Sequence, residues 1–159
     1  MVLGLLTTSL LSIVCFIVAV VKGFTMHGSV AVSQHIMWGF SATFLVTLAQ
    51  SMTMFYFIGT GKQVKDLVAN QPSGNEFVRR TKVFKAKVFP PALWAMLFTM
   101  ATMIIGGGVH TRASWTPPWL HLTLAVVSLY YNVVAFWRDG KYMIEHNMLM
   151  EELERTLSK

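Results

Sequence analysis

Three histidines, His35, His110 and His121, fall near the ends of three long apolar segments of this 159-residue chain. Each histidine continues a row of small and polar residues at three- and four-residue intervals, so each lies on one face of a helix. A polar ring on the inward face of an apolar helix needs a partner, because an unpaired polar group is costly away from water. Imidazole nitrogens bind haem iron and other metals, and they also donate hydrogen bonds. The three rings therefore indicate a bound cofactor or metal, or a hydrogen-bonded lattice between helices.

The apolar segments are long enough to cross a bilayer. Hydrophobic residues make up 54% of the chain and charged residues only 13%, which is typical of an integral membrane protein and not of a soluble domain. A helix needs about 20 apolar residues to cross the hydrocarbon core. Four stretches meet this length, so the sequence predicts a single all-α domain of four transmembrane helices at 2–21, 30–59, 88–109 and 119–137.

The basic residues are distributed unequally between the connections. Eleven of the thirteen Lys and Arg residues lie in the segment 60–87 or after residue 137, and only Lys22 and Arg112 follow the first and third spans. By the positive-inside rule, both termini and the middle segment face the cytoplasm. We therefore expect an up-down bundle with an inner basic loop (60–87) and a helical inner tail (138–159), in a bacterial inner membrane or an equivalent energy-transducing membrane. The basic loop then meets anionic lipid, and we expect no nucleic acid as a partner.

This topology places the three histidines at the same depth. Short connections make consecutive spans antiparallel, so each histidine should lie within about two helical turns, each of about 5.4 Å, of the outer interface. Lipid favours large apolar side chains, whereas small and polar residues gather where helices touch. The predicted inward rows are Thr8, Ser12, Cys15 and Ala19; His35, Gly39, Thr43, Val46, Gln50 and Thr53; Ala95, Thr99, Thr102, Gly106 and His110; and His121, Ala125, Ser128, Asn132 and Ala135.

Two imidazoles from facing helices can bind one haem iron from opposite sides, and the interior of a helix bundle is where such cofactors are held. We predict that His35 and His110 are the axial ligands of a b-type haem, with His121 as the alternative ligand or as a hydrogen-bond donor. A flat macrocycle needs little side-chain bulk beside it, and Gly39 and Gly106 would flank it. Gly106 begins a run of three glycines, each of which costs about 1 kcal/mol in a helix. Arg112 would meet a propionate at the outer interface.

Other interpretations of the same residues stay open. Three imidazoles suit a single zinc or copper ion, although no Cys, Asp or Glu accompanies them. A quinone needs only one or two hydrogen-bond donors in an apolar slot, which a histidine, Gln50, Asn132, Tyr130 or Tyr131 could supply. The histidines could also join helices in a structural or assembly subunit of a larger membrane complex. No acidic residue lies within a predicted span, which argues against a carboxylate-based proton or cation carrier.

The sequence contains no evident catalytic motif, nucleotide-binding loop or internal repeat, so we expect no catalysis by this chain alone. Its arrangement is similar to the haem-bearing membrane anchors of respiratory complexes in architecture only, since the ligand motifs of succinate dehydrogenase anchors are absent. The leading hypothesis is an electron-transfer or anchor subunit of a membrane oxidoreductase that holds haem b, with or without a quinone beside it. Such a subunit needs partner subunits, and the tail offers an apolar stripe of Ile144, Met148, Leu149, Leu153 and Leu157.

Overall fold

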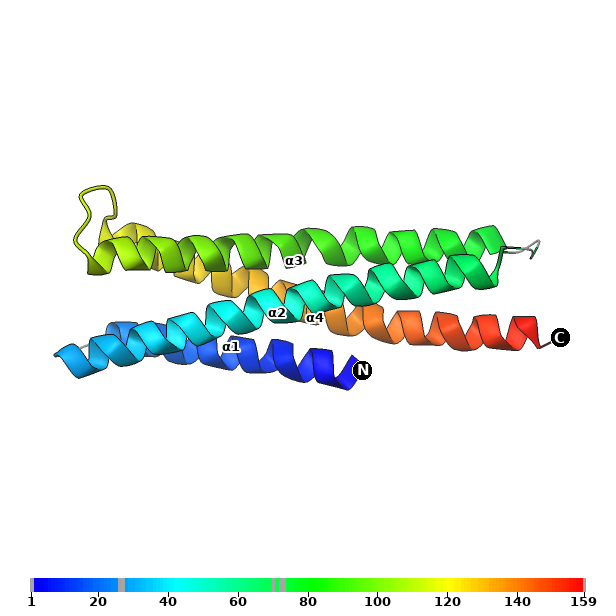
Figure 1. Cartoon of the computed structure of the whole chain (residues 1–159), viewed down its shortest axis with the longest axis horizontal. Helices are drawn as coiled ribbons and strands as arrows, with labels where there is room; N and C mark the ends of the chain where they lie inside the picture. The colour runs from blue at the N-terminus through cyan, green and yellow to red at the C-terminus, as the bar shows by residue number, and fades with distance from the viewer. Residues whose placement is uncertain (1, 26–27, 70, 72–73, 159) are drawn as a thin grey trace.

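Four long helices lie side by side in the computed structural model, which describes residues 2–25, 28–69, 71 and 74–158 (Figure 1). They are α1 (Val2–Phe24), α2 (Ser29–Leu67), α3 (Gly74–His110) and α4 (Pro118–Leu157). No strand occurs in these residues, and each helix is long and apolar enough to cross a membrane. The all-α class and the four membrane helices are thereby confirmed. Residues 26–27 and 72–73 of two predicted turns lie outside the described residues.

Three of the helices are about twice as long as the hydrocarbon core of a bilayer is thick. α2, α3 and α4 contain 39, 37 and 40 residues, which at about 1.5 Å per residue is far more than the roughly 30 Å of hydrocarbon. The segment 60–87, which we expected to be an inner loop, is mostly helical, since only a short connection separates Leu67 from Gly74. Apolar residues at helical spacing between the charges give these extensions a buried face, formed by Val64, Val68, Phe77, Phe84 and Val88.

The tail continues α4 without a break, and its apolar face packs inside the protein. Met143, Leu149 and Leu153 are almost completely buried in a core shared with α2 and α3. Of the stripe predicted to dock a partner, Leu149 and Leu153 are therefore covered, whereas Ile144 and Met148 are exposed. The buried face is thus rotated from the predicted stripe, because the chain's own helices cover the tail.

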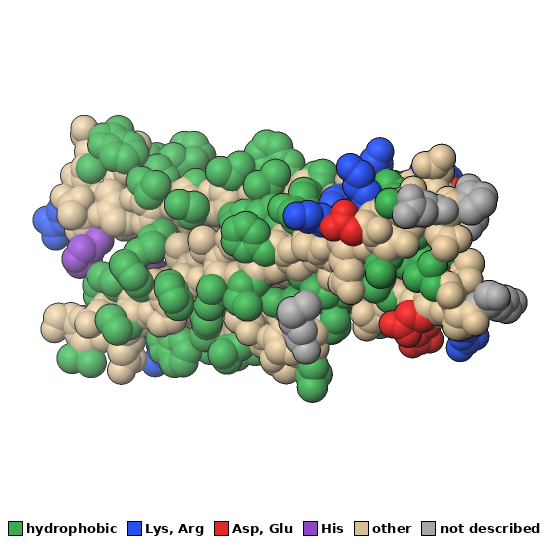
Figure 2. Space-filling view, turned by 45° about the vertical axis from the view of Figure 1, so that its right-hand side comes forward, with side chains coloured by type: hydrophobic (Ala, Val, Ile, Leu, Met, Phe, Trp, Pro, Cys, Tyr) green, Lys and Arg blue, Asp and Glu red, His purple; other side chains and the backbone are tan. Residues whose placement is uncertain are grey.

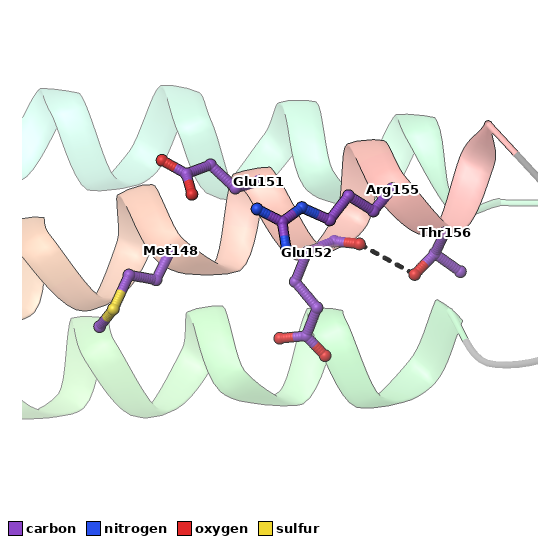
Figure 3. A pocket seen from close by; sticks show the side chains of 5 residues that line it. All are labelled: Met148, Glu151, Glu152, Arg155 and Thr156. Carbon is purple, nitrogen blue, oxygen red and sulfur yellow. Dashed lines mark hydrogen bonds between the residues drawn. The ribbon is translucent and has the colours of Figure 1, made fainter.

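A shallow surface depression lies on the exposed side of this tail (Figure 3). Met148 lines it together with four polar side chains, two of which have partners within the protein. Arg80 of α3 binds the carboxylate of Glu152 at 2.6 Å, and the Thr156 hydroxyl donates to the Glu152 carbonyl.

The helices pack as two hairpins. α1 packs mainly on α2 and α3 mainly on α4, α2 also packs on α3, and the contact between α1 and α4 is smaller. The backbones of α2 and α4 come close at few points, so these two helices lie diagonally opposite each other and meet mainly through their side chains. α1 is shorter and covers only part of the length of the other three (Figure 1). We call the end with the α1–α2 and α3–α4 connections the hairpin end, and the opposite end, where α2 meets α3, the distal end.

His146 lies in an aromatic box in the distal core. Its ring is 1% exposed, and its ring centre is 5.6 Å from that of Tyr56, 5.9 Å from that of Phe57 and 6.1 Å from that of Phe84. Neither ring nitrogen has a hydrogen-bond partner among the described residues. His146 follows His121 by 25 residues, or about 37 Å of helix, and lies beyond the predicted fourth span (119–137). Burial, and secondarily the Lys85 ammonium, lower the pKa of His146.

We expect acid to destabilise the distal core through His146. Because the folded protein holds the pKa of this ring below its ordinary value of 6.5, the unfolded chain binds more protons. Stability is therefore complete above the ordinary pKa and falls as the pH drops below it. Thermal unfolding in detergent, followed by circular dichroism at about pH 8 and about pH 5, measures this loss as the difference between the wild type and His146→Leu, which keeps every other titrating group. His146→Leu should reduce the loss by a few degrees. The exposed control His110→Leu should keep it, and an equal loss in all three proteins would refute the assignment.

Candidate functional site

A cavity of about 650 Å³ lies between the two hairpins at the hairpin end. This volume is in the range of small-molecule and cofactor sites. All four helices line the cavity, and most of the wall is apolar, with Phe16, Val20, Ile36, Phe40, Met103 and Leu122 among its residues. Histidine and basic side chains lie together at this end of the molecule (Figure 2).

His35 and His121 face each other across the cavity. They belong to the diagonal helices α2 and α4, and their ring centres are 6.0 Å apart with planes at 87°. Two imidazoles that bind one metal ion from opposite sides, each through a bond of about 2 Å, have ring centres about 6 Å apart. The observed separation therefore matches that of two ligands of one metal ion.

Each of these rings is oriented by a backbone carbonyl of the neighbouring helix. His35 Nδ1 donates to the Ala19 carbonyl of α1 at 2.8 Å, and His121 Nδ1 donates to the Thr102 carbonyl of α3 at 3.0 Å. A carbonyl oxygen can only accept, so Nδ1 carries the proton and Nε2 of the neutral ring keeps its lone pair. Metal-binding histidines usually donate their other N–H in this way. Both rings are therefore in the tautomer that binds a metal through Nε2.

Two glycines make room for the rings. A Cβ at Gly23 would lie 3.1 Å from Cε1 of His35, and a Cβ at Gly106 would lie 2.7 Å from Cε1 of His121. Each glycine follows the accepting carbonyl by four residues, so each ring lies against one turn of its neighbour's backbone. Gly39 also lines the cavity, but a Cβ there would meet nothing within 4 Å. Gly106 therefore supports an imidazole ring, whereas Gly39 leaves space open.

The two hairpins repeat the same spacing of buried positions, although most of the residue types differ. On α2 and α4, buried residues follow each histidine by 7, 11, 14, 18 and 22 positions: Ala42, Val46, Ala49, Thr53 and Phe57, against Ser128, Asn132, Ala135, Asp139 and Met143. On α1 and α3, buried residues precede each glycine by 4, 7, 11, 14 and 18 positions: Ala19, Phe16, Ser12, Ser9 and Leu5, against Thr102, Thr99, Ala95, Ala92 and Val88. An approximate two-fold axis thus runs between the hairpins and relates the two imidazoles.

His110 and Arg112 lie at the mouth of this cavity. His110 is the exposed last residue of α3, and among the described residues its ring contacts neither His35 nor His121. Arg112 has a φ of 58°, a left-handed conformation that ends the helix, with the Ala113 N–H donating to the Gly108 carbonyl. The histidine that the structure places against His35 is therefore His121. The ligation predicted for His35 and His110 stays a prediction.

The structure also locates the side chains considered for other ligands. Within the described chain, no three His, Cys, Asp or Glu residues gather as a metal site, so the three predicted imidazoles do not converge on one point. Asn132 donates to Thr99, whose hydroxyl also bonds to Ser128 at 2.7 Å, and this lattice joins α3 to α4. Of the suggested quinone donors, three histidines line the cavity, namely His35, His110 and His121, whereas Gln50, Asn132, Tyr130 and Tyr131 do not.

No family model matches the chain, and no curated protein or solved structure matches it.

Proposed function

We propose that this protein is a membrane subunit that binds one b-type haem between His35 and His121 and carries electrons within a larger redox complex. The observation that carries the proposal is the pair of facing imidazoles, 6.0 Å apart, with both Nδ1–H groups bonded to backbone carbonyls. Both Nε2 atoms are then free to ligate from diagonally opposite helices.

The residues around the imidazoles fit a haem. The cavity is apolar and of cofactor size, and its two-fold axis suits a group that takes one ligand on each face. When bound, haem supplies a one-electron carrier whose potential depends on its axial ligands and surroundings. The chain's own residues hold the ligand tautomer, exclude water with aromatic and aliphatic side chains, and place Arg112 and His110 at the mouth. Cationic and N–H donor groups there suit the carboxylates of a haem.

The charge distribution supports the membrane orientation. We infer an up-down bundle with the hairpin end at the non-cytoplasmic face and both termini on the cytoplasmic side, in a bacterial inner membrane or an equivalent energy-transducing membrane. The α2–α4 extensions, which hold most of the basic residues, then project beyond the inner leaflet. They offer surfaces for other subunits and for anionic lipid. A quinone beside the haem remains part of the proposal, as the electron donor or acceptor.

A visible spectrum of the purified chain tests the haem. We expect one haem per chain, with a sharp reduced α-band of the b type in the dithionite-reduced minus oxidised spectrum. Protein obtained without cofactor should bind added hemin in a saturable, one-to-one titration. A colourless protein that does not bind hemin would favour the alternative, a structural or assembly subunit. Stoichiometric zinc or copper without the α-band would instead support a two-histidine metal site.

A further inference from the structure

Asp139 is an acid buried completely within the four helices. Its side chain is 0% exposed, and neither carboxyl oxygen has a hydrogen-bond partner among the described residues. The Gln50 amide of α2 approaches this carboxyl group. Gln50 Oε1 and Thr53 Oγ1 are equally buried and also have no partner in the described chain. We call Gln50, Thr53 and Asp139 the axial polar cluster.

The hairpin repeat explains why these side chains converge. Thr53 and Asp139 each follow their cavity histidine by 18 residues, so they occupy equivalent positions on the two diagonal helices, beside the two-fold axis. The layer toward the cavity is formed by Ala49 and Ala135, and the layer toward the distal end by Phe57 and Met143, all of them at most 1% exposed. The axial polar cluster is therefore enclosed between two apolar layers.

An ionised carboxylate in this place would have no counter-charge. The charged chain neighbours Arg138 and Lys141 are exposed, and so is Lys87 of α3, whose carbonyl accepts from Arg138. α2 contributes the neutral Gln50 and Thr53, and α1 reaches this level with apolar Leu6 beside Gly140. His146 lies two turns farther along α4, beyond Met143. Because a lone buried charge is very unfavourable, the cluster requires one positive charge, either a proton or a monovalent cation.

We propose that Asp139 is a proton-binding site, held as a neutral carboxylic acid that pairs with Gln50. The carboxyl O–H donates to Gln50 Oε1, and the Gln50 N–H donates to the other carboxyl oxygen. One proton thus gives partners to three of the four unpartnered oxygens. Four oxygens are too few for a hard cation, which takes about six or more. Dissociation leaves a carboxylate and passes the proton to water, so the two apolar layers must part first.

Proton binding therefore stabilises the packing of α2 against α4, whether or not the cavity holds a haem. Stability should fall as the pH rises from the range in which an ordinary aspartate ionises to the pH at which Asp139 itself ionises, because over this range folding must bind a proton that the unfolded chain has released. A side-chain amide in its place stays neutral at every pH and keeps the same shape, so Asp139→Asn should resist this loss. A cation site would respond to the concentration of Na⁺ instead.

The decisive experiment combines infrared spectroscopy with thermal unfolding of the full chain in detergent. Asp66 is the only other aspartate and is exposed, so ¹³C-aspartate labelling isolates two carboxyl groups. Near neutral pH we expect an isotope-shifted C=O band of a protonated acid that persists in Asp66→Asn and disappears in Asp139→Asn. Between about pH 6 and about pH 9, the wild type and Asp66→Asn should lose several degrees more in melting temperature than Asp139→Asn.

Two results would overturn the proposal. One is the absence of the protonated-acid band from the labelled wild-type protein, a measurement that needs no variant to fold. The other is a melting temperature that rises when NaCl replaces choline chloride at equal ionic strength, with the rise abolished in Asp139→Asn. The second result would assign a sodium site to the same oxygens. Neither result depends on haem, so the proposed function can fail or hold separately.

Discussion

Replacement of His121 by alanine should abolish stoichiometric haem binding, and so should replacement of His35. Each imidazole supplies one of the two rings whose centres lie 6.0 Å apart in the cavity, and each is already held in the ligating tautomer by a carbonyl. Loss of a group that only supports a ligand typically weakens metal binding about 10- to 100-fold. Loss of a ligand itself should exceed that range. Hemin titration of each purified variant, followed by the reduced α-band, measures the effect.

His110→Ala is the matched control for these variants. It removes an imidazole from the mouth of the same cavity, but from a position without a ring contact to His35 or His121 among the described residues. We expect it to bind haem with one-to-one stoichiometry and a spectrum close to that of the wild type. Circular dichroism should show equal helix content in all three variants. If His110→Ala loses haem while His121→Ala keeps it, the ligand pair predicted from the sequence is correct and the pair inferred here is wrong.

The sequence predicted that the three histidines lie at one end of the helices, but not which two of them pair. Composition and segment length decide how many helices cross a membrane, and helical spacing decides which residues share a face. His110 and His121 therefore appear at the same depth, on similar inward rows. Which of them meets His35 depends on how the helices are arranged around the axis. That arrangement follows from packing between α1 and α2 and between α3 and α4. This packing cannot be predicted from the row of residues on any one helix.

The hairpin repeat is not evident in the sequence for a similar reason. Only the glycines, the histidines and one alanine keep their identity, as Gly23 and Gly106, His35 and His121, and Ala49 and Ala135. The intervals between glycine and histidine differ because the two turns have different lengths. What repeats is the spacing of buried positions, where Thr53 corresponds to Asp139. Asp139 lies two residues beyond the predicted end of the fourth span, so the sequence places it in the charged tail.

Gly106→Ala should weaken haem binding without destabilising the protein. The new Cβ would lie 2.7 Å from Cε1 and 3.0 Å from Nδ1 of His121, closer than side chains tolerate. The ring cannot retreat freely, because Nδ1 is bonded to the Thr102 carbonyl of the same helix at 3.0 Å. It must therefore loosen that bond and move Nε2 within the cavity. The expected loss in haem affinity is about tenfold or more, as when a supporting group of a metal ligand is removed.

Gly107→Ala separates this steric effect from the effect of alanine on the helix. Both substitutions replace glycine within α3, and each should favour the helix by up to about 1 kcal/mol. A Cβ at Gly107 would meet nothing within 4 Å, so this variant should keep wild-type haem affinity and melt at the same or a higher temperature. Gly23→Ala, which brings a Cβ to 3.1 Å from Cε1 of His35, should show a smaller loss than Gly106→Ala. Equal hemin affinity in Gly106→Ala and Gly107→Ala would mean that His121 does not bind iron from its position against α3.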